Sequence, residues 1–293
     1  MTKLLFAFFS AFSWCIARSP KFVMYGIADS LYFLTYYIIG YRKKVVNENL
    51  HRAFPKKDQK ERKKIAKKFY RHLADIVVED LAMFRMSSKR VKTFVDFHNI
   101  DLLQKEAYKD RDIITALGHY GNWEFMVTLP LFYSLKIVSV YKPLSNHFFN
   151  KEVRAMRERF GGDTAPMQNT LRAALQLHKA PQRFAMGLLS DQRPQKAHSK
   201  YWLPFLNQET AILPGPDKIA RKINAVVIFA NIQKTRRGHY DIYLELLTDQ
   251  PGDLPADEIS KMHTKRLEEI IIDKPEYWLW SHKRWKYKKE ECM

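Results

Sequence analysis

From about residue 96 onward, short apolar runs alternate with segments of helical periodicity, and this alternation limits the possible folds more than any other feature. The strand candidates are Asp112–Leu117, Ile137–Tyr141, Phe184–Leu189, Ala225–Asn231 and Tyr240–Leu246. The helix candidates are Trp123–Tyr133, Asn150–Phe160, Thr170–His178, Pro214–Ile223 and Asp257–Ile272. Such a pattern is typical of an α/β domain with a mainly parallel central sheet flanked by helices. The last two strands, joined by the basic turn Lys234–Gly238, predict a hairpin.

The segment GHYGNWE, Gly118–Glu124, follows the first strand candidate. In α/β folds, functional side chains stand in loops beyond the carboxyl ends of strands. On one continuous helix, His119 and Glu124 would lie about 140° apart and could not meet. They can meet if His119 lies in the loop and Glu124 in the first turn of the following helix. The spacing therefore suits a His–carboxylate pair.

Three further residues of this segment favour a loop that turns into a helix. Gly118 and Gly121 allow backbone conformations that other residues avoid. Asn122 is a suitable N-cap for the helix that follows, and an acid in the first turn complements the helix dipole.

The sequence offers this histidine no covalent nucleophile of the usual kind. It contains no G-x-S-x-G elbow and no H-E-x-x-H zinc pattern. Its two cysteines, Cys15 and Cys292, lie near opposite ends, which excludes a disulfide framework and a Cys-rich zinc site and indicates a reducing compartment. A histidine base here would activate a hydroxyl or amine of a substrate. The alternative is a surface histidine in a glycine-rich turn.

The charge of the chain is unusual, with 50 Lys and Arg against 31 Asp and Glu and a formal net charge of +19. Such an excess favours acidic partners: nucleic acid, anionic lipid or an acidic carrier protein. The excess is concentrated in a basic block, Arg42–Arg71, with 13 Lys or Arg and three acids. This block is of the kind attracted to anionic lipid, although a solvated helix face explains it equally well.

Two apolar segments, Leu4–Ile16 and Phe22–Tyr41, precede the basic block, and Asp29 interrupts the second. The first is too short to span a bilayer, which requires about 20 apolar residues. We expect either one imperfect span or two helices at the interface; the alternative is a buried apolar hairpin. The positive-inside rule places the basic block on the cytoplasmic side. We therefore expect a membrane-anchoring segment over residues 1–41 and a cytoplasmic domain over residues 42–293.

Several motifs together resemble the glycerolipid acyltransferase superfamily and, more closely, its lipid A late acyltransferase branch, the bacterial lauroyl and myristoyl transferases. They are H-x4-E at a strand end, LLSDQRP (Leu188–Pro194), FLNQETAILPGPDKIARKINAVVIF (Phe205–Phe229) and PEYWLWSHKRWK (Pro275–Lys286). The resemblance covers nearly the whole chain, including the apolar N-terminus.

The resemblance implies acyl transfer from an acyl carrier protein or coenzyme A thioester to a hydroxyl of a lipid acceptor, a lipid A precursor first of all. His119 would be the general base, oriented by Glu124. Backbone N–H groups around Gly121 and nearby arginines would stabilise the oxyanion. It implies no cofactor, no metal and no nucleic acid partner. It places the enzyme at the bacterial inner membrane, with its catalytic domain on the cytoplasmic side.

The resemblance also suggests substrate-binding residues: Asp191, Arg193, Arg172, Gly121 and Asn122. Asp191 would organise the site; alternatively, it caps a loop or pairs with Arg193. An arginine that many family members carry before the helix Thr170–His178 is absent here or replaced by Arg172.

Other cationic residues have two interpretations. Closely spaced arginines could face phosphates or lie on a solvated helix face: Arg154, Arg157 and Arg159. The aromatic and cationic tail could stack on nucleic acid, but the resemblance favours a role in closing the fold, with His282 outside the chemistry.

Two alternatives remain. The acceptor could instead be a hydroxyacyl aminolipid or a lysophospholipid. In another class altogether, the chain could be a non-enzymatic binder of acidic membranes or nucleic acid, which would leave His119 and Glu124 unexplained.

Overall fold

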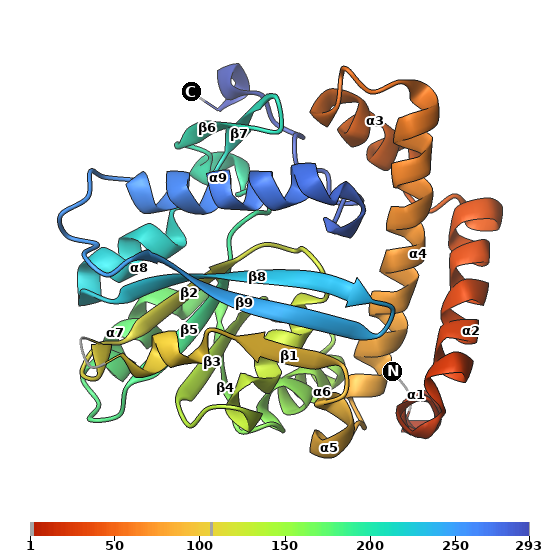
Figure 1. The fold of residues 1–293 in the computed structure, drawn as a ribbon, viewed down its shortest axis with the longest axis horizontal. Coiled ribbons are helices and arrows are strands. Elements are labelled where there is room, and N and C mark those ends of the chain that lie inside the picture. The colour runs from red at the N-terminus through yellow and green to blue at the C-terminus, as the bar shows by residue number, and fades with distance from the viewer. Residues whose placement is uncertain (1–2, 106–107, 293) are drawn as a thin grey trace.

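The computed structural model describes residues 3–105 and 108–292, and within them a seven-stranded sheet runs through the body of the protein (Figure 1). The strand order is β1-β9-β8-β2-β5-β3-β4. All neighbouring strands are parallel except β8 and β9, which form the predicted antiparallel hairpin. The strands are β1 (Val95–His98), β2 (Ile113–Leu117), β3 (Lys136–Tyr141), β4 (Asp163–Pro166), β5 (Phe184–Leu189), β8 (Val226–Arg236) and β9 (His239–Thr248). The predicted mainly parallel α/β fold is confirmed.

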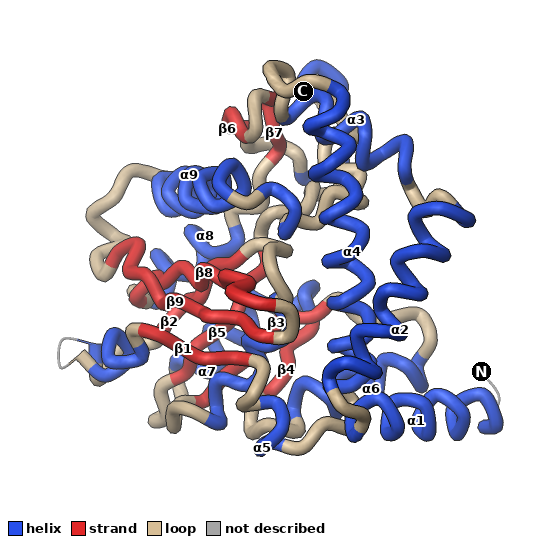
Figure 2. Tube along the Cα trace, turned by 45° about the vertical axis from the view of Figure 1, so that its right-hand side comes forward, coloured by secondary structure: helices blue, strands red, loops and turns tan. Residues whose placement is uncertain are grey.

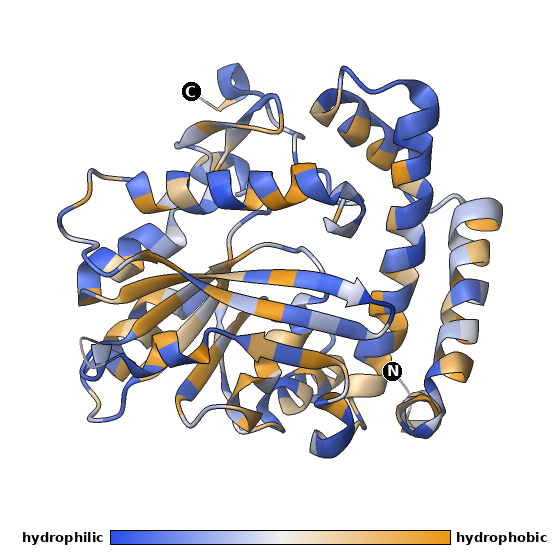
Figure 3. Ribbon diagram, in the orientation of Figure 1, coloured by the Kyte–Doolittle hydropathy of each residue, from blue (hydrophilic) through white to orange (hydrophobic). Residues whose placement is uncertain are grey.

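The centre of the sheet is buried on both faces. Every residue of β2 is buried, and its neighbours β5 and β8 are apolar along most of their length (Figure 3). Parallel strands covered by helices on both sides read as continuous apolar runs, which is why these strands could be predicted.

Most of the predicted helices also form close to their expected bounds. They are α6 (His147–Glu158), α7 (Thr170–His178), α8 (Gly215–Ile223) and α9 (Glu258–Asp273). The segment predicted as the helix Trp123–Tyr133 is instead a 3-10 helix, η4 (Trp123–Leu131), with Pro130 inside it. Proline lacks a backbone N–H, which fits the end of this helix directly after Pro130.

The unpredicted strands are short and lie away from the centre. β1 and β4 are the two edges of the sheet, and each has four residues that include an acid. Edge strands carry charges and proline more often than central ones, so they lack the apolar signal. The remaining pair, β6 (Trp202–Phe205) and β7 (Gln208–Ala211), forms a separate two-stranded sheet.

Four helices of the N-terminal part precede β1, and a short helix, α5 (Ser88–Val91), leads into that strand. They are α1 (Lys3–Arg18), α2 (Lys21–Phe33), α3 (Lys43–Ala53) and α4 (Gln59–Met83). The long helix α4 stands beside the sheet, and α2 lies along its outer side (Figures 1 and 2). α2 continues into the π-helical segment η1 (Leu34–Ile39).

The second apolar segment has one face against the protein and one face outside. Met24 and Ala28 are buried against the core, whereas Phe22 is 78% and Ile38 67% exposed. Within the described residues, Lys21–Ile39 is the one helix long and apolar enough to cross a membrane, with 22% of the apolar window buried. The predicted domain boundary at residue 41 stays a prediction.

Candidate active site

The loop Gly118–Asn122 leaves the carboxyl end of β2 in the middle of the sheet. A Cβ atom at Gly118 would lie 2.6 Å from the side chain of Leu267 in α9. Gly121 has a φ of +62°, and a Cβ atom there would lie 2.7 Å from Ile232 in β8. The glycines are therefore needed for close packing as well as for backbone conformation, and the loop has little room to shift.

His119 is held by Asp191, which follows the neighbouring strand β5. Its ring Nδ1 lies 2.6 Å from Asp191 Oδ1, and its backbone N–H donates to Asp191 Oδ2 at 2.9 Å. β2 and β5 are adjacent parallel strands, so residues that follow them meet at the same edge of the sheet. The site organiser predicted at Asp191 is thus in direct contact with the candidate base.

The C-terminal tail fixes the other side of this carboxylate. The indole N–H of Trp278 donates to Asp191 Oδ2 at 2.8 Å. The tail also pairs with the site loop, because the N–H of Gly121 donates to the carbonyl of Tyr277 at 3.0 Å and that of Leu279 to the carbonyl of His119 at 3.1 Å. The predicted role of the tail in closing the fold therefore extends to holding the site.

These contacts keep Asp191 ionised. Burial by itself would raise the pKa of this carboxyl group, but the charge and hydrogen bonds of His119, together with the indole of Trp278, outweigh burial and lower it well below its usual range. Asp191 is therefore an anionic acceptor for an Nδ1–H donor on His119.

The second ring nitrogen of His119 faces Gln192. With Nδ1 donating to Asp191, Nε2 has a lone pair that accepts from the side-chain amide of Gln192, 3.0 Å away. The ring of Trp123 meets the imidazole edge-on, with centroids 4.8 Å apart. A carboxylate-held imidazole with its other nitrogen as an acceptor is suited to taking a proton.

Glu124 does not form the predicted hydrogen bond with His119. It makes a bidentate ion pair with Arg157 of α6 instead, with Nε–Oε2 at 2.9 Å and Nη2–Oε1 at 2.5 Å. The pairing within the loop was wrong because Asp191, brought in by the sheet, already occupies Nδ1 of the imidazole. Burial alone would lower the pKa of Arg157, but Glu124 outweighs burial and raises it, so the guanidinium remains charged.

Asn122 caps the helix as predicted, but its side chain is not exposed to a substrate. Its Oδ1 accepts the backbone N–H of Glu124 at 3.1 Å. Its side chain is fully buried, and its amide nitrogen donates to Glu79 and Asp80 of α4. The backbone N–H of Gly121 is likewise used, by Tyr277. Neither group is available in this structure for the predicted substrate contact.

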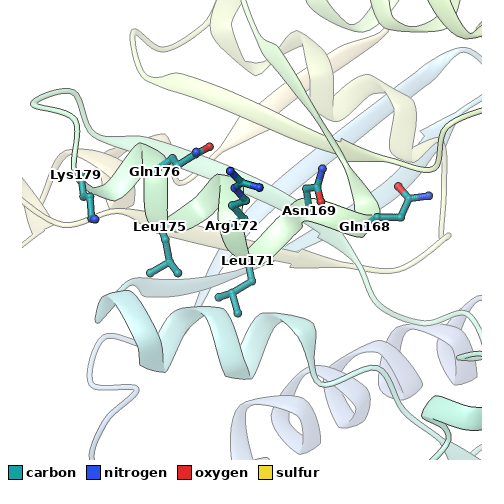
Figure 4. Close-up of a pocket in the computed structure, with 7 residues that line it drawn as sticks. All are labelled: Gln168, Asn169, Leu171, Arg172, Leu175, Gln176 and Lys179. Atoms are coloured by element: carbon teal, nitrogen blue, oxygen red, sulfur yellow. The ribbon is translucent and has the colours of Figure 1, made fainter.

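The other predicted substrate residues lie in different places. The backbone N–H of Arg193 donates to Nε2 of His282 at 3.3 Å, and its guanidinium donates to the carbonyl of Lys283 at 2.7 Å, so it does not pair with Asp191. Arg172 lines a surface pocket of about 470 Å³ along α7, with Gln168 and Asn169 near one end (Figure 4). Among the described residues, no contact joins Arg172 to His119.

His282 is adjacent to the site and stays neutral. Burial first, and then the charge of Arg193, lower its pKa to about 4. A neutral ring whose Nε2 accepts an N–H from Arg193 supports the turn after Asp191, and no hydrogen bond among the described residues joins it to His119.

A possible set of metal ligands lies away from this loop. Asp96 on β1 and His239 and Asp241 on β9 place ligand atoms within 4.8 Å of one another. The Nε2 atom of His239 lies 3.0 Å from Asp96 Oδ2 and 3.4 Å from Asp241 Oδ1, so the three side chains already contact one another. The predicted absence of a metal stays a prediction.

Comparison with known proteins identifies the family. Residues 2–287 match the family model of bacterial lipid A biosynthesis acyltransferases. The chain belongs to this family. It is therefore an acyltransferase, as predicted, and the interpretation as a non-enzymatic binder was wrong.

Two curated relatives support the assignment at low identity. The chain is 23% identical over 248 residues to the lipid A biosynthesis palmitoleoyltransferase of Escherichia coli (strain K12), covering 84% of this chain and 79% of the relative. The same values relate it to the lipid A biosynthesis acyltransferase of Shigella flexneri.

Three residues of the site were missed or left undecided from the sequence. Arg157 was one of several arginines with no reason to prefer it, and Gln192 and Trp278 lie within motifs quoted for the resemblance. Only the position of Gln192 just after the predicted strand Phe184–Leu189 could have indicated that it would face the same edge as His119.

Proposed function

We propose that this protein transfers a fatty acyl chain from an acyl carrier protein thioester to a hydroxyl group of a lipid A precursor. The observation that carries the proposal is the imidazole of His119, held through Nδ1 by an ionised Asp191 at the carboxyl edge of the sheet. The family membership and the names of the two relatives support the reaction and the acceptor. A net charge of +19 favours an acidic carrier protein as donor.

The acceptor hydroxyl takes the place that the amide of Gln192 holds at Nε2. His119 removes the hydroxyl proton through Nε2 while the oxygen attacks the thioester carbonyl carbon, and the new C–O bond gives a tetrahedral oxyanion. Collapse of this oxyanion breaks the C–S bond, and the imidazolium returns the proton to the leaving sulfur. Asp191 stabilises the imidazolium throughout. No acyl-enzyme forms, because a thioester is already activated.

Glu124 serves this reaction through Arg157 in our proposal, and no longer by orienting His119 as expected. The bidentate pair fixes the guanidinium, which α6 carries, beside Glu124 at the start of η4. η4 directly follows the loop that carries His119. Arg157 is the candidate cation for a substrate phosphate or for the oxyanion.

The enzyme works at the bacterial inner membrane, with its catalytic domain on the cytoplasmic side. The N-terminal helices and the turn after them expose large apolar side chains: Phe8, Phe12, Trp14, Phe22, Phe33, Leu34, Tyr37, Ile38, Ile39 and Tyr41. Aromatic residues at this density suit the headgroup region. The acceptor lipid would be reached from this surface.

Asp29 favours α2 lying at the interface over α2 spanning the bilayer. Its carboxylate pairs with Arg237 of the β8–β9 turn, with Nη2–Oδ1 at 2.8 Å, and with Arg71 of α4 at 3.1 Å. A spanning helix would separate this carboxylate from both cations and carry it into hydrocarbon, which is costly.

The test of the function uses the full-length protein with lauroyl, myristoyl and palmitoleoyl acyl carrier proteins and a lipid A precursor. Mass spectrometry should show one acyl chain added to the precursor, and none with His119→Ala. If the acyl chain is added to an ornithine lipid or a lysophospholipid and not to the lipid A precursor, the proposed acceptor is wrong. Turnover with acyl coenzyme A alone would replace the donor.

A further inference from the structure

Glu79 is a buried carboxylate that the acyl-transfer steps do not use. It lies in α4 and is 0% exposed. Its Oε1 accepts from the hydroxyl of Tyr25 at 2.6 Å, and its Oε2 accepts from the hydroxyl of Tyr240 at 2.8 Å and the amide of Asn122 at 2.9 Å. α2, β9 and the site loop thus converge on a single side chain. Burying a carboxylate without such donors costs free energy, and these three hydrogen bonds offset that cost.

Asn122 links Glu79 to the reacting groups. It lies three residues after His119 and caps η4 through the N–H of Glu124. Its amide nitrogen also lies 3.2 Å from Asp80 Oδ1. The end of the loop and the start of the helix are therefore placed by the hydrogen bonds of one amide group, whose firmest acceptor is Glu79.

Other charged groups around Glu79 are themselves held in place. Lys234 of β8 donates to Asp75 Oδ2 at 2.8 Å, one turn before Glu79 on α4. Nε2 of His72 lies 3.3 Å from the carbonyl of Gly121, so α4 contacts the loop at a second point. Burial raises the pKa of Glu79, and the charge of Lys234 and the hydrogen bonds of Asn122 and Tyr25 oppose that rise.

We propose that Glu79 is a positioning residue of the acyl-transfer site, which holds Asn122 and through it the loop that carries His119. Through Tyr25, the same carboxylate makes the N-terminal helix α2 part of the support of the site. This inference rests on the proposed acyl transfer.

Small displacements of this loop should have large effects on the rate. Gly118 and Gly121 pack against α9 and β8 without space for a side chain, so the loop fits in one place only, and His119 depends on Asn122 to hold the far end of the loop in that place. A misplacement of about 1 Å can cost about 10²-fold in rate. Substrate affinity, which depends on a wider surface, should change much less.

An exchange of the amide and the carboxylate tests the proposal in the full-length protein. Asn122→Asp still caps Glu124 but sets a new carboxylate against those of Glu79 and Asp80. We expect it to lower kcat about 10–100-fold, with KM for acyl carrier protein thioester within about threefold of the unchanged protein. Adding Glu79→Gln restores a donor and an acceptor between these two positions in reversed order, while the contact with Asp80 stays as in the single variant. We therefore expect the double variant to recover part of the lost kcat, about tenfold.

Tyr240→Phe is the matched control, because it removes another hydrogen bond to Oε2 of Glu79 from a residue that makes no hydrogen bond to the loop in the described structure. We expect a lower melting temperature and kcat within about twofold of the unchanged protein. A double variant no faster than Asn122→Asp, or a loss in Tyr240→Phe as large as in Asn122→Asp, would overturn the positioning role.

Folding is checked by thermal melts of every variant. If Asn122→Asp alone does not fold, the double variant carries the test: an active double variant supports the proposal, and a folded inactive one contradicts it. Absence of acyl transfer by the unchanged protein would instead contradict the proposed function.

Discussion

Asp191 and Glu124 both lie beside the loop that carries His119, but their partners differ: one is the candidate base and the other is a permanent cation. Asp191 is 72 residues away in sequence and holds the imidazole through Nδ1. Glu124 is five residues away and holds the guanidinium of Arg157. The carboxylate that contacts His119 is thus the one more distant in sequence, because neighbouring parallel strands bring distant residues to one edge of the sheet.

The H-x4-E spacing suggests that Glu124 pairs with His119, but in the structure Glu124 pairs with Arg157 and Asp191 pairs with His119. Here the spacing places a base in the loop and an acid at the first turn of η4, on two sides of the capping residue Asn122. One acid serves the base and the other serves a cation. The variants that follow remove each of these parts in turn.

Removal of the imidazole should have the largest effect. His119→Ala deletes the general base, and we expect kcat to fall about 10²–10⁴-fold in a protein that still folds but melts at a lower temperature, because the buried Asp191 loses its imidazole partner. The measurement is release of carrier protein thiol, together with mass spectrometry of the lipid product. Near-normal turnover by a folded variant would sink the mechanism.

The Asp191 side of the comparison should follow closely. Asp191→Asn replaces an ionised acceptor by an amide that can favour the wrong tautomer of His119, so we expect a loss of kcat of about 10²–10³-fold. Trp278→Phe removes the indole donor to Oδ2 together with part of a ring buried against Phe205 and Trp280. We expect a milder loss of kcat, about tenfold, and a lower melting temperature. Equal and small losses in both would remove Asp191 from the chemistry.

Variants of Glu124 should lose less activity, and the loss should depend on the ion pair with Arg157. Glu124→Gln keeps the size of the side chain but removes the bidentate ion pair with Arg157, and we expect a loss of about 10–100-fold. Arg157→Lys keeps the charge without the forked geometry and should lose a similar factor. An unchanged kcat in Arg157→Lys together with a large loss in Glu124→Gln would show that Glu124 does not act through Arg157.

The smallest effect concerns stability and pH beside Asp191. The pKa of His282 is lowered to about 4, below its usual value, so between about pH 6.5 and 4 the unfolded chain binds more protons than the folded one. The stability that a neutral His282 gives is therefore complete above this window and is lost as pH falls through it. Glu79 and Asp80, whose pKa values are raised by burial, act in the opposite direction.

The readout is therefore the difference between two proteins. We expect the melting temperature of the unchanged protein, relative to that of His282→Gln, to fall between pH 7 and pH 4.5. A constant difference across this range would show that His282 is not held neutral.

The sheet was largely predictable because its central strands are buried on both faces. Phe184–Leu189 and Thr170–His178 formed at their predicted bounds. β1 and β4 were missed because short edge strands such as Asp163–Pro166 have polar residues and no apolar run. In the N-terminal part, apolar residues predicted helices, but their contacts with α4 depend on tertiary packing.

From the residues alone, the site could be predicted only as far as local sequence reaches, and the family resemblance added Asp191 as an organiser of the site. His119, the cap at Asn122 and the turn at Gly121 follow from GHYGNWE itself. The partner of His119 does not, because it depends on β5 lying beside β2, and the sequence contains no pattern that fixes strand order. Arg157 was one basic residue among several on its helix, and only Glu124 in the folded protein distinguishes it.

The measurement that tests the account most directly is a pair of double variants in the His119→Ala background, assayed with radiolabelled thioester to detect residual turnover. If Asp191 acts through His119, adding Asp191→Asn should slow the residual rate by less than about twofold, while adding Glu124→Gln should cost its full factor of about 10–100. The reverse pattern, with Glu124→Gln silent and Asp191→Asn costly, would contradict the assignment of Asp191 as the partner of His119.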